Sequence, residues 1–177
     1  EVIYVRADGL PAQGVADRAF GASDGVAMLK YCYVDVNGNT DPIALFEDYR
    51  RGIAALASRH PGLTIVHFTL PLTASERTLR FWKLRLLGRP TTREVNAVRG
   101  RYNALLRETY SGRAPVFDIA RLESTGADGS QSFFTRGADT VFTMVAEYTP
   151  DGGHLTPTAA RMVAEQLLIF LAKLPGS

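Results

Sequence analysis

The chain has 177 residues, 46% of them hydrophobic, which is enough to bury the core of one compact domain. Its 20 basic and 18 acidic residues leave a net charge of +2, too small to indicate a nucleic-acid partner. A single cysteine, Cys32, excludes an internal disulfide and a multi-cysteine metal site, and no apolar run could cross a bilayer. The start carries neither Met nor a signal-peptide pattern, so we expect a mature form, a trimmed chain or a fragment, and no compartment is predicted.

The first half of the chain predicts three strands and one helix. Residues 2–5 form a short β-rich run, and the almost continuously apolar run 26–36 is typical of a strand buried on both faces of a parallel sheet. A turn over 37–42 leads into a helix that stops at 60–62, with apolar residues at helical spacing: Ile43, Leu45, Phe46, Tyr49, Ile53, Leu56 and Ala57. Residues 63–70 predict a further core strand, closed by Pro71.

Residues 72–92 break this rhythm with a basic segment, which we interpret as an insertion over the functional site. Cationic and aromatic side chains gather in it: Arg77, Arg80, Phe81, Trp82, Lys83, Arg85 and Arg89. The segment could be a lid that binds acidic or sugar substrates, or an amphipathic helix with a solvated cationic face.

The second half continues the alternation of helix and strand. A helix is expected over 93–110 after a cap at Thr91 or Thr92, then a core strand over 114–120. Residues 123–147 are rich in Gly, Ser and Thr and predict a long surface loop, and 156–174 predict a closing amphipathic helix. This order predicts an α/β fold in a single domain: a three-layer α/β/α sandwich with a mainly parallel sheet.

In such sheets the chemistry gathers outside the carboxyl ends of the strands. The loops expected there follow residues 5, 36, 70 and 120, together with the turn before the last helix. Two polar segments coincide with these places, 37–41 and 151–154. We therefore expect the functional site between them.

The most informative motif is Asp151-Gly-Gly-His154-Leu155, directly before the closing helix. An acid three residues before a histidine can hold one tautomer of the imidazole and stabilise the imidazolium. The other ring nitrogen is then free to accept a proton from a nucleophile. The alternative is a simple turn and helix cap, since Asp-Gly-Gly forms turns, Thr156 can cap and Pro157 suits the first helical position.

This block resembles the last sequence block of the SGNH (GDSL-type) hydrolases, which is Asp-x-x-His at the entrance to the final helix. The resemblance implies an SGNH- or flavodoxin-like sandwich and a serine esterase, such as a carbohydrate O-acetyl esterase. It implies that His154 is the base, that Asp151 orients it, and that no cofactor or metal is needed. The expected partner is a small-molecule or carbohydrate ester substrate, with no nucleic acid and no membrane span.

SGNH enzymes hold the oxyanion with an Asn in a Gly-x-Asn block at the end of the third strand. The string Val36-Asn37-Gly38-Asn39 occupies that place here, so the resemblance points to Asn39 or Asn37. Both asparagines are also ordinary turn formers, and this alternative stays open. Asp35 could orient a neighbour or bind a substrate hydroxyl instead.

The nucleophile is the part of the family pattern that the sequence does not display. The string nearest to a Gly-Asp-Ser block is 7–10, where Gly9 takes the place of the serine and would give a dead enzyme. The spacing favours another alignment, in which residues 2–5 are the second strand of a 2-1-3-4-5 sheet. The missing first strand would then lie between strands 2–5 and 26–36, supplied by residues outside this sequence, a second chain or another topology.

No serine or cysteine of the chain is chosen as nucleophile. Cys32 lies inside a predicted strand, and the serines fall on a strand entrance, a helix, the insertion or the long loop: Ser23, Ser58, Ser75, Ser124, Ser130 and Ser132. His67 is expected to be a hydrogen-bonded core residue, and His60 to complement the dipole at a helix end. Nothing has metal-ligand spacing, and the usual nucleotide-binding loops are missing.

The sequence therefore leaves two functional hypotheses open. The first is an SGNH-type serine esterase; the second is a catalytically inactive domain of the same shape that binds a glycan or a protein. A flavodoxin-like regulatory domain is a weaker third, because it leaves the Asp151–His154 pair unexplained. Covalent labelling by an acyl-enzyme trap separates the first two.

Overall fold

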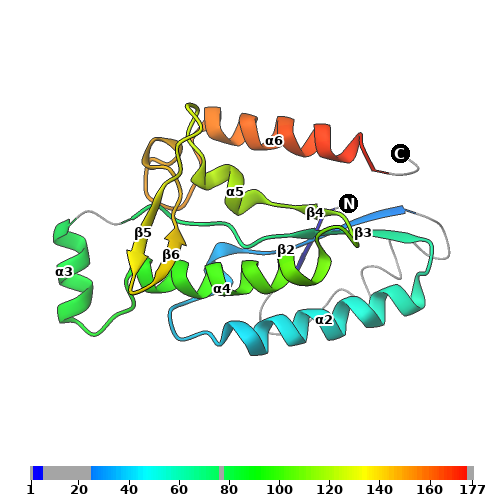
Figure 1. The fold of residues 1–177 in the computed structure, drawn as a ribbon, viewed down its shortest axis with the longest axis horizontal. Coiled ribbons are helices and arrows are strands. Elements are labelled where there is room, and N and C mark those ends of the chain that lie inside the picture. The colour runs from blue at the N-terminus through cyan, green and yellow to red at the C-terminus, as the bar shows by residue number, and fades with distance from the viewer. Residues whose placement is uncertain (1, 6–24, 76–77, 175–177) are drawn as a thin grey trace.

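The computed structural model describes residues 2–5, 25–75 and 78–174. Four parallel strands form its main sheet, in the order β1 (Val2–Val5), β2 (Gly25–Tyr31), β3 (Leu63–Phe68) and β4 (Val116–Phe117). The register pairs Val2 with Met28, Gly25 with Leu63 and His67 with Val116. Figure 1 shows this sheet running through the middle of the molecule between helices.

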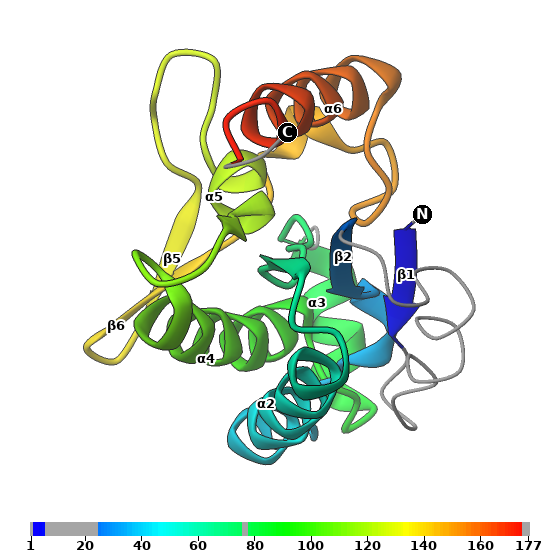
Figure 2. The ribbon, with the colours of Figure 1, turned by 90° about the vertical axis from the view of Figure 1, so that its right-hand side faces the viewer.

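Helices cover both faces of the sheet, as the views in Figures 1 and 2 agree. The helices α2 (Pro42–Arg59) and α4 (Thr92–Tyr110) lie on one face, and α5 (Ile119–Ser124) and α6 (Pro157–Leu171) on the other. One buried cluster belongs to each side: Leu29, Tyr31, Val36, Leu45, Phe46, Tyr49, Ile53, Leu56, Ile65, Leu70, Tyr102 and Leu106; and Val66, Phe68, Phe117, Ile119 and Leu174. The predicted α/β fold with a parallel sheet between helical layers is confirmed.

Side-chain caps explain where the long helices begin. Asp41 accepts the N–H groups of Ile43 and Ala44 at the start of α2, with Pro42 at the first helical position. Thr91 and Glu94 form a capping box that starts α4. Thr156 caps α6 ahead of Pro157.

Three buried polar side chains hold the segment that follows β3, because its backbone would otherwise be unpaired. The Asn103 amide bonds both the N–H and the C=O of Leu70, at 2.6 and 2.9 Å. Asn96 does the same for Thr73, and Glu123 accepts the Leu72 N–H at 2.6 Å. The segment is therefore fixed to α4 and α5 as it passes toward the functional site.

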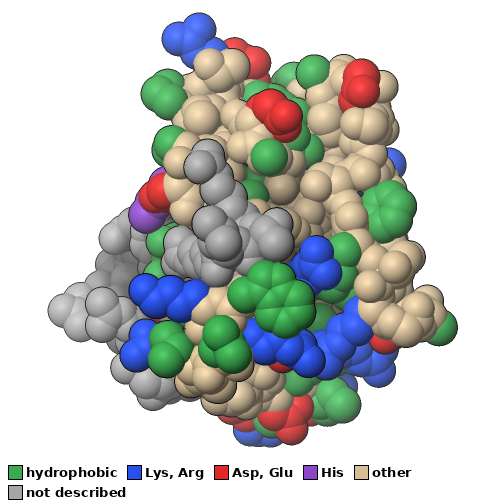
Figure 3. Space-filling view, turned by 90° about the vertical axis from the view of Figure 1, so that its left-hand side faces the viewer, with side chains coloured by type: hydrophobic (Ala, Val, Ile, Leu, Met, Phe, Trp, Pro, Cys, Tyr) green, Lys and Arg blue, Asp and Glu red, His purple; other side chains and the backbone are tan. Residues whose placement is uncertain are grey.

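One helix of the described residues lies outside the sandwich. The helix α3 (Thr78–Leu86) stands apart from the layers in Figure 1, and its end exposes 54% of Trp82 and 85% of Leu86. Figure 3, which views the molecule from that side, shows Lys and Arg side chains gathered among hydrophobic ones. The first residues of the predicted insertion differ, since Leu72 and Ala74 are buried in the core. The lid role of 72–92 stays a prediction.

Several expected boundaries are wrong. The predicted strand 26–36 ends at Tyr31 and turns into the 3-10 helix η1 (Tyr33–Asp35), while the strand expected over 114–120 reduces to β4 before α5 begins. The predicted loop 123–147 contains the hairpin β5 (Phe133–Arg136) and β6 (Asp139–Phe142), then the 3-10 helix η2 (Ala146–Tyr148). Ser124, expected in that loop, is buried in α5.

The predicted gap in the sheet is also wrong. All four residues of β1 pair directly with β2, so no strand lies between them. Strand β1 thus takes the place beside β2 that the 2-1-3-4-5 order gives to the first strand. The string 7–10 with Gly9, and Ser23, lie outside the described residues. Across the part of the chain that is described, no helix is long and apolar enough to span a bilayer.

The two remaining histidines occupy the places expected of them. His67 is 2% exposed, stacks on Tyr110 with ring centroids 3.7 Å apart, and shares a 2.7 Å hydrogen bond with the Tyr49 hydroxyl. Burial lowers the pKa of His67 to about 4. His60 is the C-cap of α2. The contacts of both histidines therefore belong to the core and to a helix end.

Candidate functional site

The turn 151–154 brings the predicted acid and histidine together. Asp151 Oδ2 lies 2.6 Å from His154 Nδ1, while Asp151 Oδ1 accepts the N–H groups of Gly153 and His154 at 2.9 and 2.8 Å. These backbone donors, and then the His154 imidazole, hold the pKa of the Asp151 carboxyl well below its usual range. The carboxylate is therefore ionised and fixed, so the neutral imidazole carries its proton on Nδ1 and leaves the Nε2 lone pair free.

Backbone geometry holds this turn against the rest of the molecule. Gly152 has φ +94°, a conformation that favours glycine, and its carbonyl accepts the Ala74 N–H at 2.9 Å. A Cβ on Gly153 would lie 3.5 Å from the Tyr33 ring, so the turn also packs closely on Tyr33. Gly152 thus allows the turn, and Gly153 lies against the ring of Tyr33, two residues after β2.

Tyr33 is the residue that faces the free ring nitrogen. Its hydroxyl lies 3.3 Å from His154 Nε2, and the two rings meet edge to face at a centroid distance of 5.7 Å. Tyr33 belongs to η1, directly after β2, and therefore stands at the carboxyl end of a central strand. Within the described residues, the hydroxyl at Nε2 belongs to this tyrosine and not to a serine.

Arg99 of α4 supports Tyr33 from the interior. It is 3% exposed and donates from Nη2 to the Tyr33 carbonyl at 2.6 Å, with its guanidinium 6.0 Å from the Tyr33 ring centre. Its Nη1 bonds Thr73 Oγ1 and Asn96 Oδ1 at 3.2 and 3.3 Å. The only signals in the sequence were an Arg and an Asn on the inward face of a predicted helix, three residues apart.

Asn37 and Asn39, the two residues expected at the oxyanion, lie further along the chain than Tyr33. Both are exposed, and the Asn37 side chain accepts the Asn39 N–H at 2.9 Å in a local turn. A Cβ on Gly38 between them would lie 2.6 Å from Pro90, so this turn packs on the segment before α4. They follow η1 and not the end of a strand, because β2 ends at Tyr31 instead of residue 36. Asp35 accepts the Cys32 N–H at 2.9 Å and caps η1.

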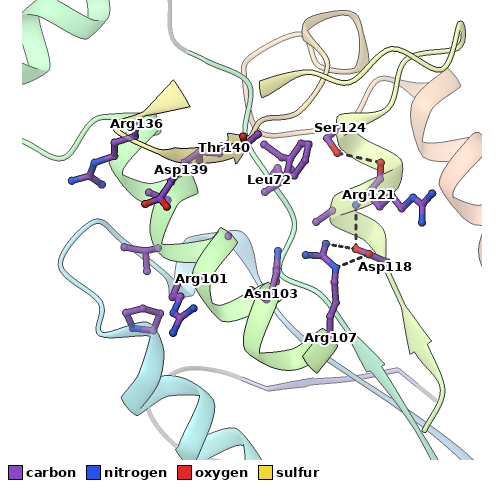
Figure 4. Close-up of a pocket in the computed structure, with 18 of the residues that line it drawn as sticks. Leu72, Arg101, Asn103, Arg107, Asp118, Arg121, Ser124, Arg136, Asp139 and Thr140 are labelled. Carbon is purple, nitrogen blue, oxygen red and sulfur yellow. Dashed lines mark hydrogen bonds and ion pairs between the residues drawn. The ribbon is translucent and has the colours of Figure 1, made fainter. Parts of the chain in front are cut away.

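The dyad is open to solvent, with the side chains of His154 and Asp151 exposed by 69% and 52%. A cavity of about 860 Å³ lies elsewhere, between α4, α5 and the β5–β6 hairpin (Figure 4). Figure 4 shows Arg107 paired with Asp118 at its wall, at 2.7 Å. Neither Asp151 nor His154 lines this cavity. This cavity is therefore not the site expected between residues 37–41 and 151–154.

The serines of the described residues do not reveal a nucleophile. Ser124 donates to the Arg121 carbonyl, Ser132 shares a bond with Thr143, and Ser130 bonds Asp128. Ser75 is exposed and follows Ala74, whose N–H bonds the Gly152 carbonyl in the turn 151–154. Free Cys32 is half-buried before η1.

Comparison with known proteins shows the fold but no family. No family model matches the chain, and no curated protein matches it. A solved Streptococcus pneumonia protein, provisionally described as a platelet activating factor, is similar with a TM-score of 0.56 and 18% identity. The match covers 85% of this chain and 61% of that one, so this chain spans about three fifths of its length.

A second solved structure, the salicylyl-acyltransferase SsfX3 from a tetracycline biosynthetic pathway, is more distant. It is 15% identical with a TM-score of 0.40, over 88% of this chain and 40% of that one. At these identities the likeness concerns the fold alone. The chain thus has an α/β fold similar to that of the Streptococcus protein, and the SGNH resemblance stays a prediction.

Proposed function

We propose that the chain carries the acid–base half of an acyl-ester hydrolase of the SGNH type, acting on a small ester such as a carbohydrate O-acetyl group. The observation that supports this most is the 2.6 Å contact between Asp151 Oδ2 and His154 Nδ1, with Nε2 turned to a hydroxyl. An ionised carboxylate, one fixed tautomer and a free ring nitrogen are what a general base requires.

In the proposed reaction, His154 Nε2 takes the proton of a nucleophile hydroxyl while its oxygen bonds to the acyl carbon. The ester C–O bond then breaks, and the departing alcohol takes that proton from the imidazolium, which Asp151 stabilises. Water attacks the acyl-enzyme by the same route and releases the carboxylic acid. Asn39 or Asn37 would hold the oxyanion once substrate is bound.

The nucleophile is proposed to come from outside the described residues. A longer natural polypeptide or a second chain would supply it, since the one serine of residues 6–24, Ser23, enters a strand instead of following one. Among the described serines, Ser75 is the one whose neighbour touches the catalytic turn. Labelling with a fluorophosphonate, followed by peptide mapping, would identify the nucleophile.

The second candidate is an inactive domain of the same shape that binds a glycan or a protein. It is favoured by the direct pairing of β1 with β2, because β1 then precedes the string in which Gly9 takes the serine's position. The exposed dyad adds to this, since a polar pair open to solvent can also bind a ligand.

The test uses the full-length protein, p-nitrophenyl acetate and three variants. We expect His154→Gln and Asp151→Asn to lower turnover by about 10³-fold or more, with unchanged thermal unfolding. Asp128→Asn is the matched control, because the exposed Asp128 also accepts hydrogen bonds within a turn, but from Ser130 and not from the dyad. No acyl-enzyme in the wild type would refute the esterase and favour the binding domain. Full turnover in His154→Gln would refute His154 as the base.

A further inference from the structure

We infer that Tyr33 is the positioning residue of the His154 imidazole, and that the buried Arg99 holds Tyr33 in place. The inference rests on the proposed function only where it assigns Tyr33 a part in catalysis. The contacts of Tyr33 with His154 and Arg99 are independent of that function. Tyr33 is not a member of the expected triad, and its position next to a base calls for an explanation.

An exposed imidazole needs two points of contact to be fixed. Asp151 supplies one, at Nδ1, but a ring held at a single atom can still rotate about that bond. Tyr33 supplies the second through its hydroxyl, 3.3 Å from Nε2, and through its ring edge, which meets the imidazole at an interplanar angle of 89°. With Nδ1 bonded to an ionised acid, the Nε2 lone pair accepts the Tyr33 O–H.

The Tyr33 hydroxyl takes the place that a nucleophile's hydroxyl would occupy. Nε2 has one lone pair, so the two hydroxyls compete for it, and at 3.3 Å the tyrosine is a weak competitor. Tyr33 therefore keeps the ring in its productive orientation while the site is empty, then yields to the nucleophile. The proton still passes from nucleophile to His154.

Arg99 closes a circuit of contacts around the site. It joins the Tyr33 carbonyl to Thr73, and the residue after Thr73 donates its N–H to the Gly152 carbonyl in the catalytic turn. Both sides of the dyad are therefore tied to one guanidinium. Its planar fork serves Tyr33 from Nη2 and both Thr73 and Asn96 from Nη1, whereas a lysine would have to serve all three from one nitrogen.

Burying Arg99 costs free energy, which indicates that this side chain has a role other than stabilising the fold. Its Nε is buried without a hydrogen-bond partner, and burial lowers the pKa of the guanidinium to about 10. A buried cation with an unsatisfied donor contributes little to stability by itself. We therefore infer that Arg99 serves to position Tyr33.

The test measures access to Nε2 without requiring any activity. Diethyl pyrocarbonate acylates unprotonated histidine nitrogen, and His154 is exposed while His60 and His67 are 9% and 2% exposed. The tryptic peptide 137–161 contains His154 as its single histidine, so mass spectrometry reports its rate. We expect Tyr33→Phe to raise that rate about threefold to tenfold, the worth of one hydrogen bond.

Tyr148→Phe is the matched control, because the Tyr148 hydroxyl donates to the Thr125 carbonyl at 2.8 Å elsewhere in the fold. Its His154 rate should stay within twofold of the wild type. Arg99→Lys keeps the charge but loses the fork, and should raise the rate as Tyr33→Phe does. If Arg99→Lys does not fold, Tyr33→Phe decides alone. An unchanged His154 rate in Tyr33→Phe would overturn the inference.

Turnover of the full-length protein separates this inference from the proposed function. We expect Tyr33→Phe to lower kcat by about threefold to tenfold with KM unchanged, since it misplaces the base and not the substrate. Tyr148→Phe should leave both constants alone. Faster modification of His154 in a protein without any esterase activity would support the positioning role and refute the esterase. An active enzyme whose Tyr33→Phe variant keeps the wild-type kcat and modification rate would refute Tyr33 alone.

Discussion

Glu123 makes the stability of this protein depend on pH in a direction opposite to most carboxylates. Its side chain is 2% exposed, and Oε2 accepts the Leu72 N–H at 2.6 Å. Burial raises the pKa of the Glu123 carboxyl to about 7, although the Leu72 N–H, Lys30 and Arg99 each favour the charged form. Desolvation outweighs these three contributions together.

The sign follows from proton binding. The folded state holds the Glu123 proton more tightly than the unfolded chain, whose carboxyl titrates near 4.5, so stability is complete below that pH and is lost as the pH rises to 7. Each pH unit of this difference corresponds to about 1.4 kcal/mol, which gives a loss of about 3 kcal/mol. Glu123→Gln keeps an oxygen for the Leu72 N–H and removes the titration.

Urea unfolding of wild type and Glu123→Gln between pH 4 and 8 measures the effect. The stability of the variant relative to the wild type should rise by about 3 kcal/mol across this range, and His67 cancels because both proteins contain it. Glu165→Gln is the control, since Glu165 is exposed on α6, and its difference should stay flat. A flat difference for Glu123→Gln, within about 1 kcal/mol, would refute the argument from burial.

Two further predictions concern the core histidine His67 and the turn 151–154. Because burial lowers the pKa of His67 to about 4, the folded state binds a proton on His67 less tightly than the unfolded chain does. The free energy of unfolding of Glu123→Gln should therefore fall by up to about 3 kcal/mol from pH 6.5 to 4. In the double variant with His67→Phe, urea unfolding should show no such fall. Gly152→Ala must adopt φ +94° and should cost about 1–3 kcal/mol, seen as a lower Tm and slower fluorophosphonate labelling. Gly100→Ala, in open space on α4, should instead gain about 0.5–1 kcal/mol, and equal effects of the two changes would contradict the strain at Gly152.

Local sequence signals placed much of the fold and one pair of the site. The capping residues Asp41, Thr91 and Thr156 act within three or four residues of themselves, so the starts of α2, α4 and α6 could be read directly. The Asp151–His154 contact is equally local, because a turn with two glycines closes it. Hydrophobic periodicity was sufficient for the layers and for the burial of the core.

The nonlocal parts of the site lay beyond such signals. Tyr33 stands 121 residues from His154 in sequence, and Arg99 stands 66 residues from Tyr33, so nothing in the local pattern links them. An apolar run does not mark where a strand leaves the sheet. The end of β2 at Tyr31, with Tyr33 beside the imidazole, could therefore not be predicted.

The sequence by itself determined the alternation of strands and helices and the pairing of an acid with a base at one end of the sheet. Tertiary structure decided the order of the strands, the role of Glu123 and Asn103 in holding the segment after β3, and which hydroxyl faces Nε2. The physical reason is that periodicity and caps act over one or two turns of chain. The satisfaction of buried polar groups is settled only when distant segments pack together.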